Sequence, residues 1–272
     1  MESIHRVYNN MVDSYHKIIS LKFFIILFFT VRAFSQFPFQ PGEKMKYEIS
    51  WTFLKAGIAE FYMEKAKNPN PEMFHIVLKA KSIGIISSFF FVDDHIESFV
   101  DFHSFCSHKA IKHQREGRWV SDEISEFDYD NSKIYFKQNK ITKRGLEKND
   151  LTYELGFPCI QDVLSCFYYF RILPLKIDAF YEIPVFDRKR KSIVKVRVKE
   201  KESIKTPFGE FDCFVLEILS GLRGSFQTSK GKLFIWITED EKRIPVRFKS
   251  SFTIGYSVAE LIEYQEGNKI NE

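Results

Sequence analysis

Residues 157–175, FPCIQDVLSCFYYFRILPL, constrain the fold most, because this stretch has the pattern of a helix among segments that alternate as strands do. Pro158 suits the first position of a helix, and Pro174 ends it because proline removes a backbone donor and clashes with the preceding turn. The apolar residues with helical spacing are Ile160, Val163, Leu164, Phe167 and Phe170. Cysteine and tyrosine side chains widen this stripe around the helix. A helix at about 158–173 therefore needs cover on several sides, which predicts a curved sheet wrapped around it.

In the rest of the chain from Gly42 onward, apolar and polar residues alternate with a period of two, which is typical of strands with one face exposed to solvent. Met45, Tyr47 and Ile49 alternate with charged and polar residues, and similar segments recur to Tyr264. About nine to eleven short strands result, which predicts a mainly β fold in which a single curved antiparallel sheet forms a half-barrel or barrel. We expect residues 37–266 to form one domain, residues 267–272 to be a disordered tail, and residues 137–150 to be a polar, exposed loop.

Composition and charge exclude some partners and favour a sheet. The chain has 30 Phe and 12 Tyr against 12 Gly, and aromatic residues favour half-buried pleated surfaces. The net charge is +4, of which the first 35 residues contribute +2 through four basic and two acidic residues. The small remaining excess does not predict a nucleic-acid partner, which requires a concentrated basic face. The basic run at 189–191 is interpreted as a solvated turn.

The first 35 residues have the pattern of a secretory signal peptide. Lys17 and Lys22 precede the apolar run FFIILFFTV, and Ala33-Phe34-Ser35 forms a cleavage site before Gln36. The apolar run is about half the ~20 residues that a membrane span needs. We therefore expect a periplasmic or otherwise exported protein with no transmembrane segment in the mature chain. No cysteine follows the cleavage site, so a lipoprotein is not expected. A retained N-terminal anchor and a start at Met11 are the alternatives.

The four cysteines could be oxidised in an exported protein. Cys159 and Cys166 lie seven residues apart on the predicted helix, so about 10.5 Å would separate their Cα atoms. A disulfide needs less than about 7 Å, which excludes a bond between these two. Buried free thiols are the preferred interpretation for all four, including Cys106 and Cys213.

Several phrases of the sequence resemble one bacterial envelope family. They are FQPGEKMKYEISW with KAGIAEF (39–61), VDDHIESF (92–99), QDVLSCFYYFR with its PL (161–175), TPFGEFDCF (206–214) and GKLFIWITEDEKRIPVRF (231–248). Together they resemble the family known as domain of unknown function 3108. The resemblance implies an exported protein without an established activity. It also implies a fold similar to the half-barrels of lipoprotein carriers, in which a curved antiparallel sheet can hold acyl chains.

Candidate catalytic and metal-binding groups are weakly supported. Asp93, Asp94 and His95 could suggest acid–base chemistry, but neighbouring strand residues point to opposite faces. Ser165 has no G-x-S-x-G motif around it, so a nucleophilic serine is not expected. The possible metal ligands lack close-spaced pairs; they are His103, Cys106, His108 and His113. We therefore expect no enzyme activity, metal or cofactor, and a hydrolase that uses Asp94 or His95 remains a lesser alternative.

Aromatic side chains are the best candidates for a ligand pocket between sheet and helix. The six candidates are Trp51, Phe89, Phe90, Phe167, Tyr168 and Trp236. A filled core is the competing interpretation, because protein interiors pack densely. The sequence thus predicts an envelope protein that binds or carries a lipid or acyl chain. The alternative is an assembly factor that binds another envelope protein through an exposed sheet edge or the 137–150 segment.

Overall fold

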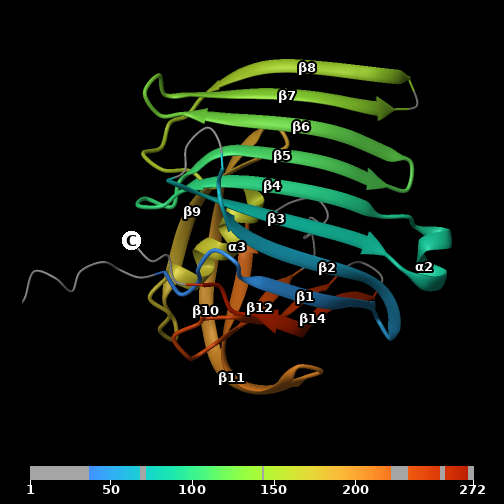
Figure 1. Ribbon diagram of the computed structural model, residues 1–272, viewed down its shortest axis with the longest axis vertical. Coiled ribbons are helices and arrows are strands. Elements are labelled where there is room, and N and C mark those ends of the chain that lie inside the picture. The colour runs from blue at the N-terminus through green and yellow to red at the C-terminus, as the bar shows by residue number, and fades with distance from the viewer. Residues whose placement is uncertain (1–36, 68–71, 143, 222–231, 252–254, 269–272) are drawn as a thin grey trace, which may run out of the picture. The chain divides into compact units, whose positions relative to one another are not determined.

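The structure, a computed structural model, describes residues 37–67, 72–142, 144–221, 232–251 and 255–268 (Figure 1). The described residues from Pro38 onward belong to one compact unit. The predicted signal peptide, with its cleavage site and alternative start, lies outside the described residues, as does the end of the C-terminal tail.

One antiparallel sheet of 14 strands accounts for most of the described chain. Its strands are β1 (Lys44–Trp51), β2 (Leu54–Lys65), β3 (Met73–Ser82), β4 (Asp93–Asp101), β5 (Ser107–Glu116), β6 (Trp119–Asp128), β7 (Lys133–Thr142), β8 (Gly145–Glu154), β9 (Phe180–Asp187), β10 (Arg190–Thr206), β11 (Gly209–Ser220), β12 (Leu233–Thr238), β13 (Pro245–Ser251) and β14 (Tyr256–Gln265). Their spatial order is β8-β7-β6-β5-β4-β3-β2-β1-β14-β13-β12-β11-β10-β9. The order follows the chain apart from the β1–β14 pairing, where Tyr47 is paired with Leu261, and the sheet does not close. The predicted β fold with a curved sheet is confirmed, with more strands than the nine to eleven expected.

The polar segment 137–150 is not a loop, and that prediction was wrong. It forms most of the hairpin β7–β8, in which Lys137 is paired with Asp150. The inner face of β7 begins with the buried Ile134 and Phe136 and continues with the buried amide of Gln138. Because polar side chains replace apolar ones on the inner face, the alternation that identifies a strand is lost from the sequence.

Two helices, α2 (Gly84–Phe89) and α3 (Val163–Ile172), occur in the part of the chain that the structure describes. The predicted helix starts five residues later than its predicted start at 158. Asp162 is its N-cap and accepts hydrogen bonds from the backbone N–H groups of Leu164 (2.8 Å) and Ser165 (3.1 Å). The hydroxyl of Ser165 accepts the backbone N–H of Asp162 at 3.0 Å, completing a capping box. Gln161 is instead bridged to Val185 of the edge strand β9.

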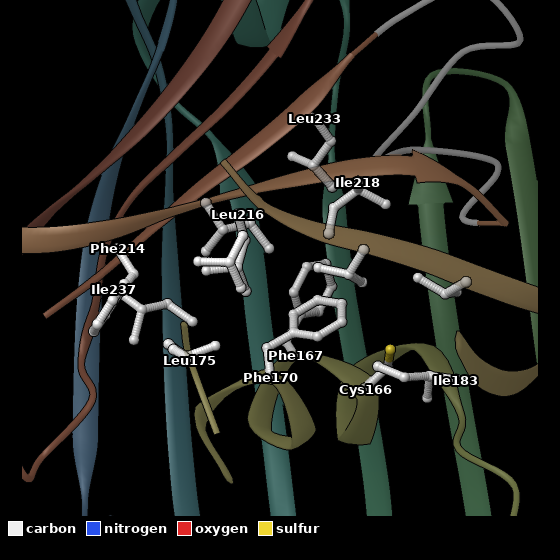
Figure 2. Packing of buried hydrophobic residues seen from close by; sticks show 14 of the residues in the cluster. Cys166, Phe167, Phe170, Leu175, Ile183, Phe214, Leu216, Ile218, Leu233 and Ile237 are labelled. Carbon is white, nitrogen blue, oxygen red and sulfur yellow. The ribbon is translucent and has the colours of Figure 1, made fainter. Parts of the chain in front are cut away.

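The helix α3 is buried nearly all round, as its sequence predicts. Phe167 and Phe170 project from α3 into a cluster of aliphatic side chains from β9 to β12 (Figure 2). On another side of the helix, the Tyr168 ring packs edge-on against Phe39, with 5.2 Å between ring centroids. A second, smaller cluster around Phe136 and Phe186 joins β7 to β9. The helix and the curved sheet therefore form the core together.

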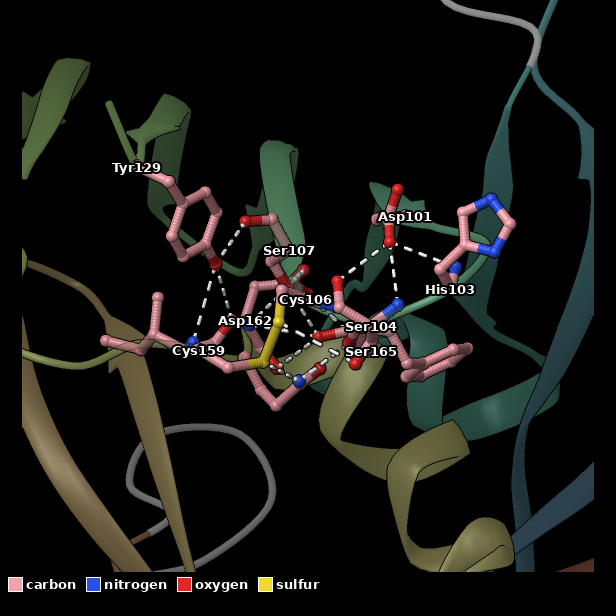
Figure 3. Close-up of a disulfide and its surroundings, with 12 residues drawn as sticks. Asp101, His103, Ser104, Cys106, Ser107, Tyr129, Cys159, Asp162 and Ser165 are labelled. Carbon is pink, nitrogen blue, oxygen red and sulfur yellow. Dashed lines mark hydrogen bonds between the residues drawn. A yellow bond between two sulfur atoms is a disulfide. The ribbon is translucent and has the colours of Figure 1, made fainter. Parts of the chain in front are cut away.

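Cys106 and Cys159 form a disulfide, so the interpretation of all four cysteines as free thiols was wrong. The bond ties the connection before β5 to the segment that precedes α3, and Asp162, Ser107 and Tyr129 surround it (Figure 3). The pairing is possible because Cys159 lies before the helix, in a bend next to the start of β5, where the backbone N–H of Ser107 donates to the oxygen of Ile160 at 3.1 Å. Cys166 and Cys213 are buried free thiols, as expected.

Candidate functional site

The interior of the curved sheet contains an apolar cavity of about 450 Å³. Inward-facing residues of β1 to β5 and of β12 to β14 form its walls, and Phe167 of α3 contributes to them. The lining side chains follow strand alternation, with Tyr47 and Ile49 on β1 and Leu78 and Ala80 on β3. The remaining lining residues are Ala59, Phe61, Phe90, Val92, Asp94, Ile96, Glu116, Leu233, Phe248, Ser250, Ser257 and Ala259.

Small side chains at inward positions leave this space unfilled. Ala59, Ala80 and Ala259 come from strands β2, β3 and β14, and all three line the cavity. At these positions a larger apolar residue would fill the interior, as aromatic residues do beside α3. The cavity is therefore set by alanine side chains on three strands that lie near one another in the sheet order.

The cavity leads from the core to the surface. Its inner walls include Tyr47 and Phe167, which are nearly fully buried, whereas the Phe90 side chain is 52% exposed. A second apolar cavity of about 480 Å³ adjoins the first, because both are lined by Phe90 and Val92. It lies toward the end of the sheet where β1 ends and α2 begins, an end that we call the mouth end; its lining includes Trp51 and Phe89.

Gly57 lies in the lining of the second cavity and holds β2 close to β3. A Cβ atom at this position would lie 2.7 Å from the backbone oxygen of Lys81, closer than real Cβ contacts. Glycine is thus needed where the two strands approach each other. The KAGIAEF phrase contains this glycine and also supplies Ala59 to the first cavity.

The two acidic groups of the first cavity lie on one wall, formed by β4 and β5. Asp94 is 7% exposed, and its carboxylate accepts hydrogen bonds from the backbone N–H of Arg115 (2.9 Å) and the side-chain amide of Gln114 (3.3 Å). Burial, reinforced by the negative charge of Glu116, raises the pKa of Asp94 to about 6, although the Arg115 N–H opposes the shift. The same Gln114 amide donates to Glu116 at 3.1 Å. An apolar cavity with one acidic wall results.

Four of the six predicted pocket residues line the two cavities, and two do not. Trp51 and Phe89 line the outer cavity, Phe167 the inner one, and Phe90 both. Tyr168 is buried away from both cavities against Phe39. The remaining candidate, Trp236, is also buried, and its indole N–H donates to Glu202 at 2.8 Å.

Sequence reasoning did not identify the aliphatic and alanine lining or Asp94 as cavity residues. Alternation placed Tyr47, Ile49 and Leu78 on one face of their strands. It does not show whether that face packs against other side chains or borders a cavity. The available signal was alanine at inward positions, of which Ala59 and Ala80 are examples on adjacent strands.

The other candidate sites are dispersed or engaged in structure. Asp94 faces inward, whereas the His95 imidazole lies 3.3 Å from Glu97 on the outer face of β4. Cys106 is held in the disulfide and so is not a thiolate ligand. The Ser165 hydroxyl belongs to the helix cap. Over the described ranges, no group of three or more His, Cys, Asp or Glu side chains is arranged to hold a metal ion.

The model of the family described as "Protein of unknown function (DUF3108)" matches residues 46–262. The chain belongs to the DUF3108 family. The matched range extends from β1 into β14 and contains every lining residue of the inner cavity. No curated protein matches this DUF3108 chain.

Solved structures resemble this DUF3108 protein in fold at low identity. A β-barrel-like protein of domain of unknown function DUF1849 from Brucella abortus is 10% identical, with a TM-score of 0.54 over 85% of this chain and 99% of that one. A protein described as exported, with a YmcC-like fold, from Bacteroides fragilis is 11% identical (TM-score 0.37; 85% and 98% covered). A protein described as a lipoprotein from Parabacteroides distasonis is also 11% identical (TM-score 0.31; 84% and 98%).

Within the described residues of this DUF3108 protein, neither helix has the length and apolar character that crossing a bilayer requires.

Proposed function

We propose that this DUF3108 protein is an exported, non-enzymatic protein that binds a hydrophobic ligand, such as a lipid or an acyl chain, between its sheet and α3. The observation that carries the proposal is the apolar cavity, which reaches from Phe167 in the core to Phe90 at the surface. A buried cavity without a route to solvent would not admit such a ligand, whereas this one is continued outward by the second cavity.

The size and the lining of the cavity suit a hydrocarbon chain. Its volume of about 450 Å³ lies within the range of about 300–1,000 Å³ that is typical of ligand pockets. Each methylene group that moves from water into an apolar site contributes about 0.8 kcal/mol. The polar lining is limited to Asp94, Glu116, Ser250 and Ser257, so most of a bound molecule would contact carbon.

Two independent features support export. The N-terminal sequence has the charged region, apolar run and small-residue cleavage site of a signal peptide. The disulfide between Cys106 and Cys159 fits an oxidising compartment outside the cytoplasm, because cytosolic proteins rarely keep such bonds.

The absence of enzyme activity is part of the proposal. No histidine belongs to the described cavity lining, and its two serines, Ser250 and Ser257, lie on β13 and β14 and not on the strands beside β4. His95 points to the other face of β4. The buried carboxyl group of Asp94 instead receives a backbone N–H from β5, which gives it a role in holding the wall together.

The proposal is tested by filling the cavity. Ala259→Phe places a ring inside it, whereas the control Val258→Phe places the same ring on the opposite face of β14. Native mass spectrometry of gently purified protein should show a co-purifying lipid, and fluorescence titration with N-phenylnaphthylamine should give saturable binding. We expect Ala259→Phe to lose the lipid and to bind the probe at least about tenfold more weakly, with Val258→Phe unchanged.

Two outcomes would overturn the proposal. One is wild-type protein that carries no lipid and does not bind the probe. The other is equal probe affinity in the two variants after thermal melting shows that both are folded.

The alternative role as an assembly factor has less support from the sheet edges. The edge strand β8 is charged and mostly exposed, with Glu147, Lys148 and Asp150 in its middle. Charged side chains on an edge oppose pairing with a further strand. At the other edge, the backbone of Gln161 already occupies part of β9.

A further inference from the structure

Exposed apolar side chains gather at the mouth end, around the outer cavity. They lie in the β1–β2 turn and in the connection that contains α2, and two of them, Phe53 and Phe89, are each 84% exposed. We call this set the apolar rim; it comprises Trp51, Phe53, Leu54, Ile85, Phe89, Phe90 and Phe91. The two connections are adjacent, because the backbone N–H of Ile83 donates to the oxygen of Ala56 at 2.9 Å and α2 lies beside the start of β2 (Figure 1).

Among the described residues, a cluster of this kind occurs at one end of the molecule only. At the opposite end, where β1 begins and β14 ends, the exposed large apolar residues are Ile177, Phe180 and Phe208, on separate connections or strand ends. Contiguous exposed apolar surface is rare on proteins that contact only water, and it marks a site of contact with another surface.

Charge separates the same two ends. Within the described residues, the connections at the mouth end contain no Asp or Glu; their basic residues are Arg118, Arg144, Arg188, Lys189 and Lys232. The connections at the opposite end are rich in acidic residues, which include Asp130, Asp178, Glu239, Asp240 and Glu241. The mouth end is therefore apolar at the cavity entrance and cationic around it.

We infer that the mouth end docks on the surface of an anionic lipid bilayer, with the apolar rim in the interfacial region and the basic connections against the headgroups. Aromatic and aliphatic side chains bind the membrane interface by burying apolar area, and Lys and Arg add attraction to anionic lipids. A lipid could then pass between the bilayer and the cavity without crossing water, because Trp51, Phe89 and Phe90 belong both to the rim and to the cavity walls. This inference extends the proposed ligand binding and rests on it, because the docking serves to bring a lipid to the cavity.

Charge decides between a bilayer and a protein partner. A protein surface that complements the mouth end would need an apolar patch inside an acidic ring. An anionic bilayer supplies both over any area, and it is also the source of the ligand class that the cavity suits.

Vesicle flotation tests the inference with the protein purified in the form that accumulates after export. We expect the protein to float with phosphatidylcholine vesicles that contain phosphatidylglycerol, and to bind pure phosphatidylcholine vesicles at least about tenfold more weakly. The rim variant is Phe53→Ser with Phe89→Ser, and its matched control is Phe180→Ser with Phe208→Ser at the opposite end.

The charge variant is Arg118→Glu with Arg144→Glu. Its control, Lys176→Glu with Lys205→Glu, changes the net charge equally at the opposite end. Both mouth-end variants should weaken vesicle binding about tenfold or more, and both controls should bind as the wild type does. Two outcomes would overturn the inference. One is equal weakening of vesicle binding by the variants and their controls. The other is wild-type protein that does not bind anionic vesicles but gives a discrete protein adduct on crosslinking in cells.

A separate readout distinguishes this inference from the proposed function. Binding of N-phenylnaphthylamine without vesicles should be unchanged in the charge variant, and Ala259→Phe should still float with anionic vesicles. Loss of probe binding by wild-type protein would defeat the proposed function alone, whereas loss of flotation alone would defeat the docking.

Discussion

Arg171 of α3 and Glu43, just before β1, form a fully buried ion pair that joins two segments 128 positions apart in the sequence. The guanidinium contacts both carboxylate oxygens, at 2.6 and 2.8 Å, and both side chains are 0% exposed. The Arg171 nitrogens also donate to the backbone oxygens of Arg243 and Lys242, each at 2.9 Å. The guanidinium lies 4.8 Å from the centroid of the Phe39 ring. The C-terminal end of α3 is thus fixed to the start of β1 and to the β12–β13 connection.

Removing one partner of this pair should destabilise the protein strongly. Arg171→Met leaves a buried carboxylate without its cation, and we expect a loss of about 3–5 kcal/mol in the free energy of unfolding by urea denaturation. The control is Lys55→Met, which removes an exposed partner of Glu48 and should cost less than about 1 kcal/mol. Similar losses in the two variants would contradict the role given to Arg171.

The partner of Arg171 could not be predicted from the sequence, because nothing local connects Glu43 with a residue 128 positions further along the chain.

The disulfide provides a second prediction. It closes a loop with a sequence separation of 53, and the loss of chain entropy in the unfolded state then corresponds to about 4 kcal/mol. Cys106→Ala with Cys159→Ala should lower the free energy of unfolding by about that amount.

Thiol counting checks the pairing directly. In denaturant without reductant, only the thiols of Cys166 and Cys213 should react with a thiol reagent, and all four should react after reduction. Four reactive thiols before reduction would show that the disulfide is absent.

Asp162 provides a third prediction, because one carboxylate caps α3 and holds two strands. Besides the helix N–H groups, it accepts hydrogen bonds from the hydroxyls of Ser98 on β4 and Ser107 on β5. Asp162→Ala removes the cap and leaves buried donors without a partner, so we expect a loss of more than about 2 kcal/mol by urea denaturation. Asp128→Ala, which loses an exposed turn contact to Asn131, is the control and should cost far less. An equal cost would show that the network around Asp162 is not important for stability.

The same residues explain why the start of the helix was misplaced. Pro158 is compatible with a first helical turn, but the D-x-x-S pattern of Asp162 and Ser165 forms a complete cap four residues later. The local sequence allows both starts, and the disulfide at Cys159 with the Gln161–Val185 bridge selects the later one.

The fold class could be predicted because most strands keep one apolar face. The hairpin β7–β8 could not be predicted, because polar side chains are buried on its inner face. The side-chain amide of Gln138 donates there to the carboxylate of Glu123 at 2.7 Å. The cavity could not be predicted either, since it depends on which inward side chains of separate strands converge. Ala59 and Ala259 reach the same cavity although 200 positions separate them in the sequence.

The last prediction concerns the acidic wall of the cavity and its dependence on pH. Burial raises the pKa of Asp94 from its ordinary value of 3.8 to about 6, so the folded protein holds this proton more tightly than the unfolded chain does. The favourable contribution of the protonated carboxyl is complete below about pH 4 and is lost as the pH rises to about 6. The total change is at most about 3 kcal/mol, because one pKa unit corresponds to about 1.4 kcal/mol.

Asp94→Asn removes this titration while keeping a side-chain oxygen that can accept the Arg115 N–H. Urea denaturation between about pH 4 and pH 7 should show Asp94→Asn gaining stability relative to wild type as the pH rises, with no further gain above about pH 6. Asp93→Asn changes an exposed carboxylate on the opposite face of β4, and its stability relative to wild type should stay constant over this pH range. If the stability difference between Asp94→Asn and wild type does not change across this pH range, the carboxyl group titrates alike in the folded and unfolded states. In that case, the carboxyl group of Asp94 would be more hydrated than its burial implies.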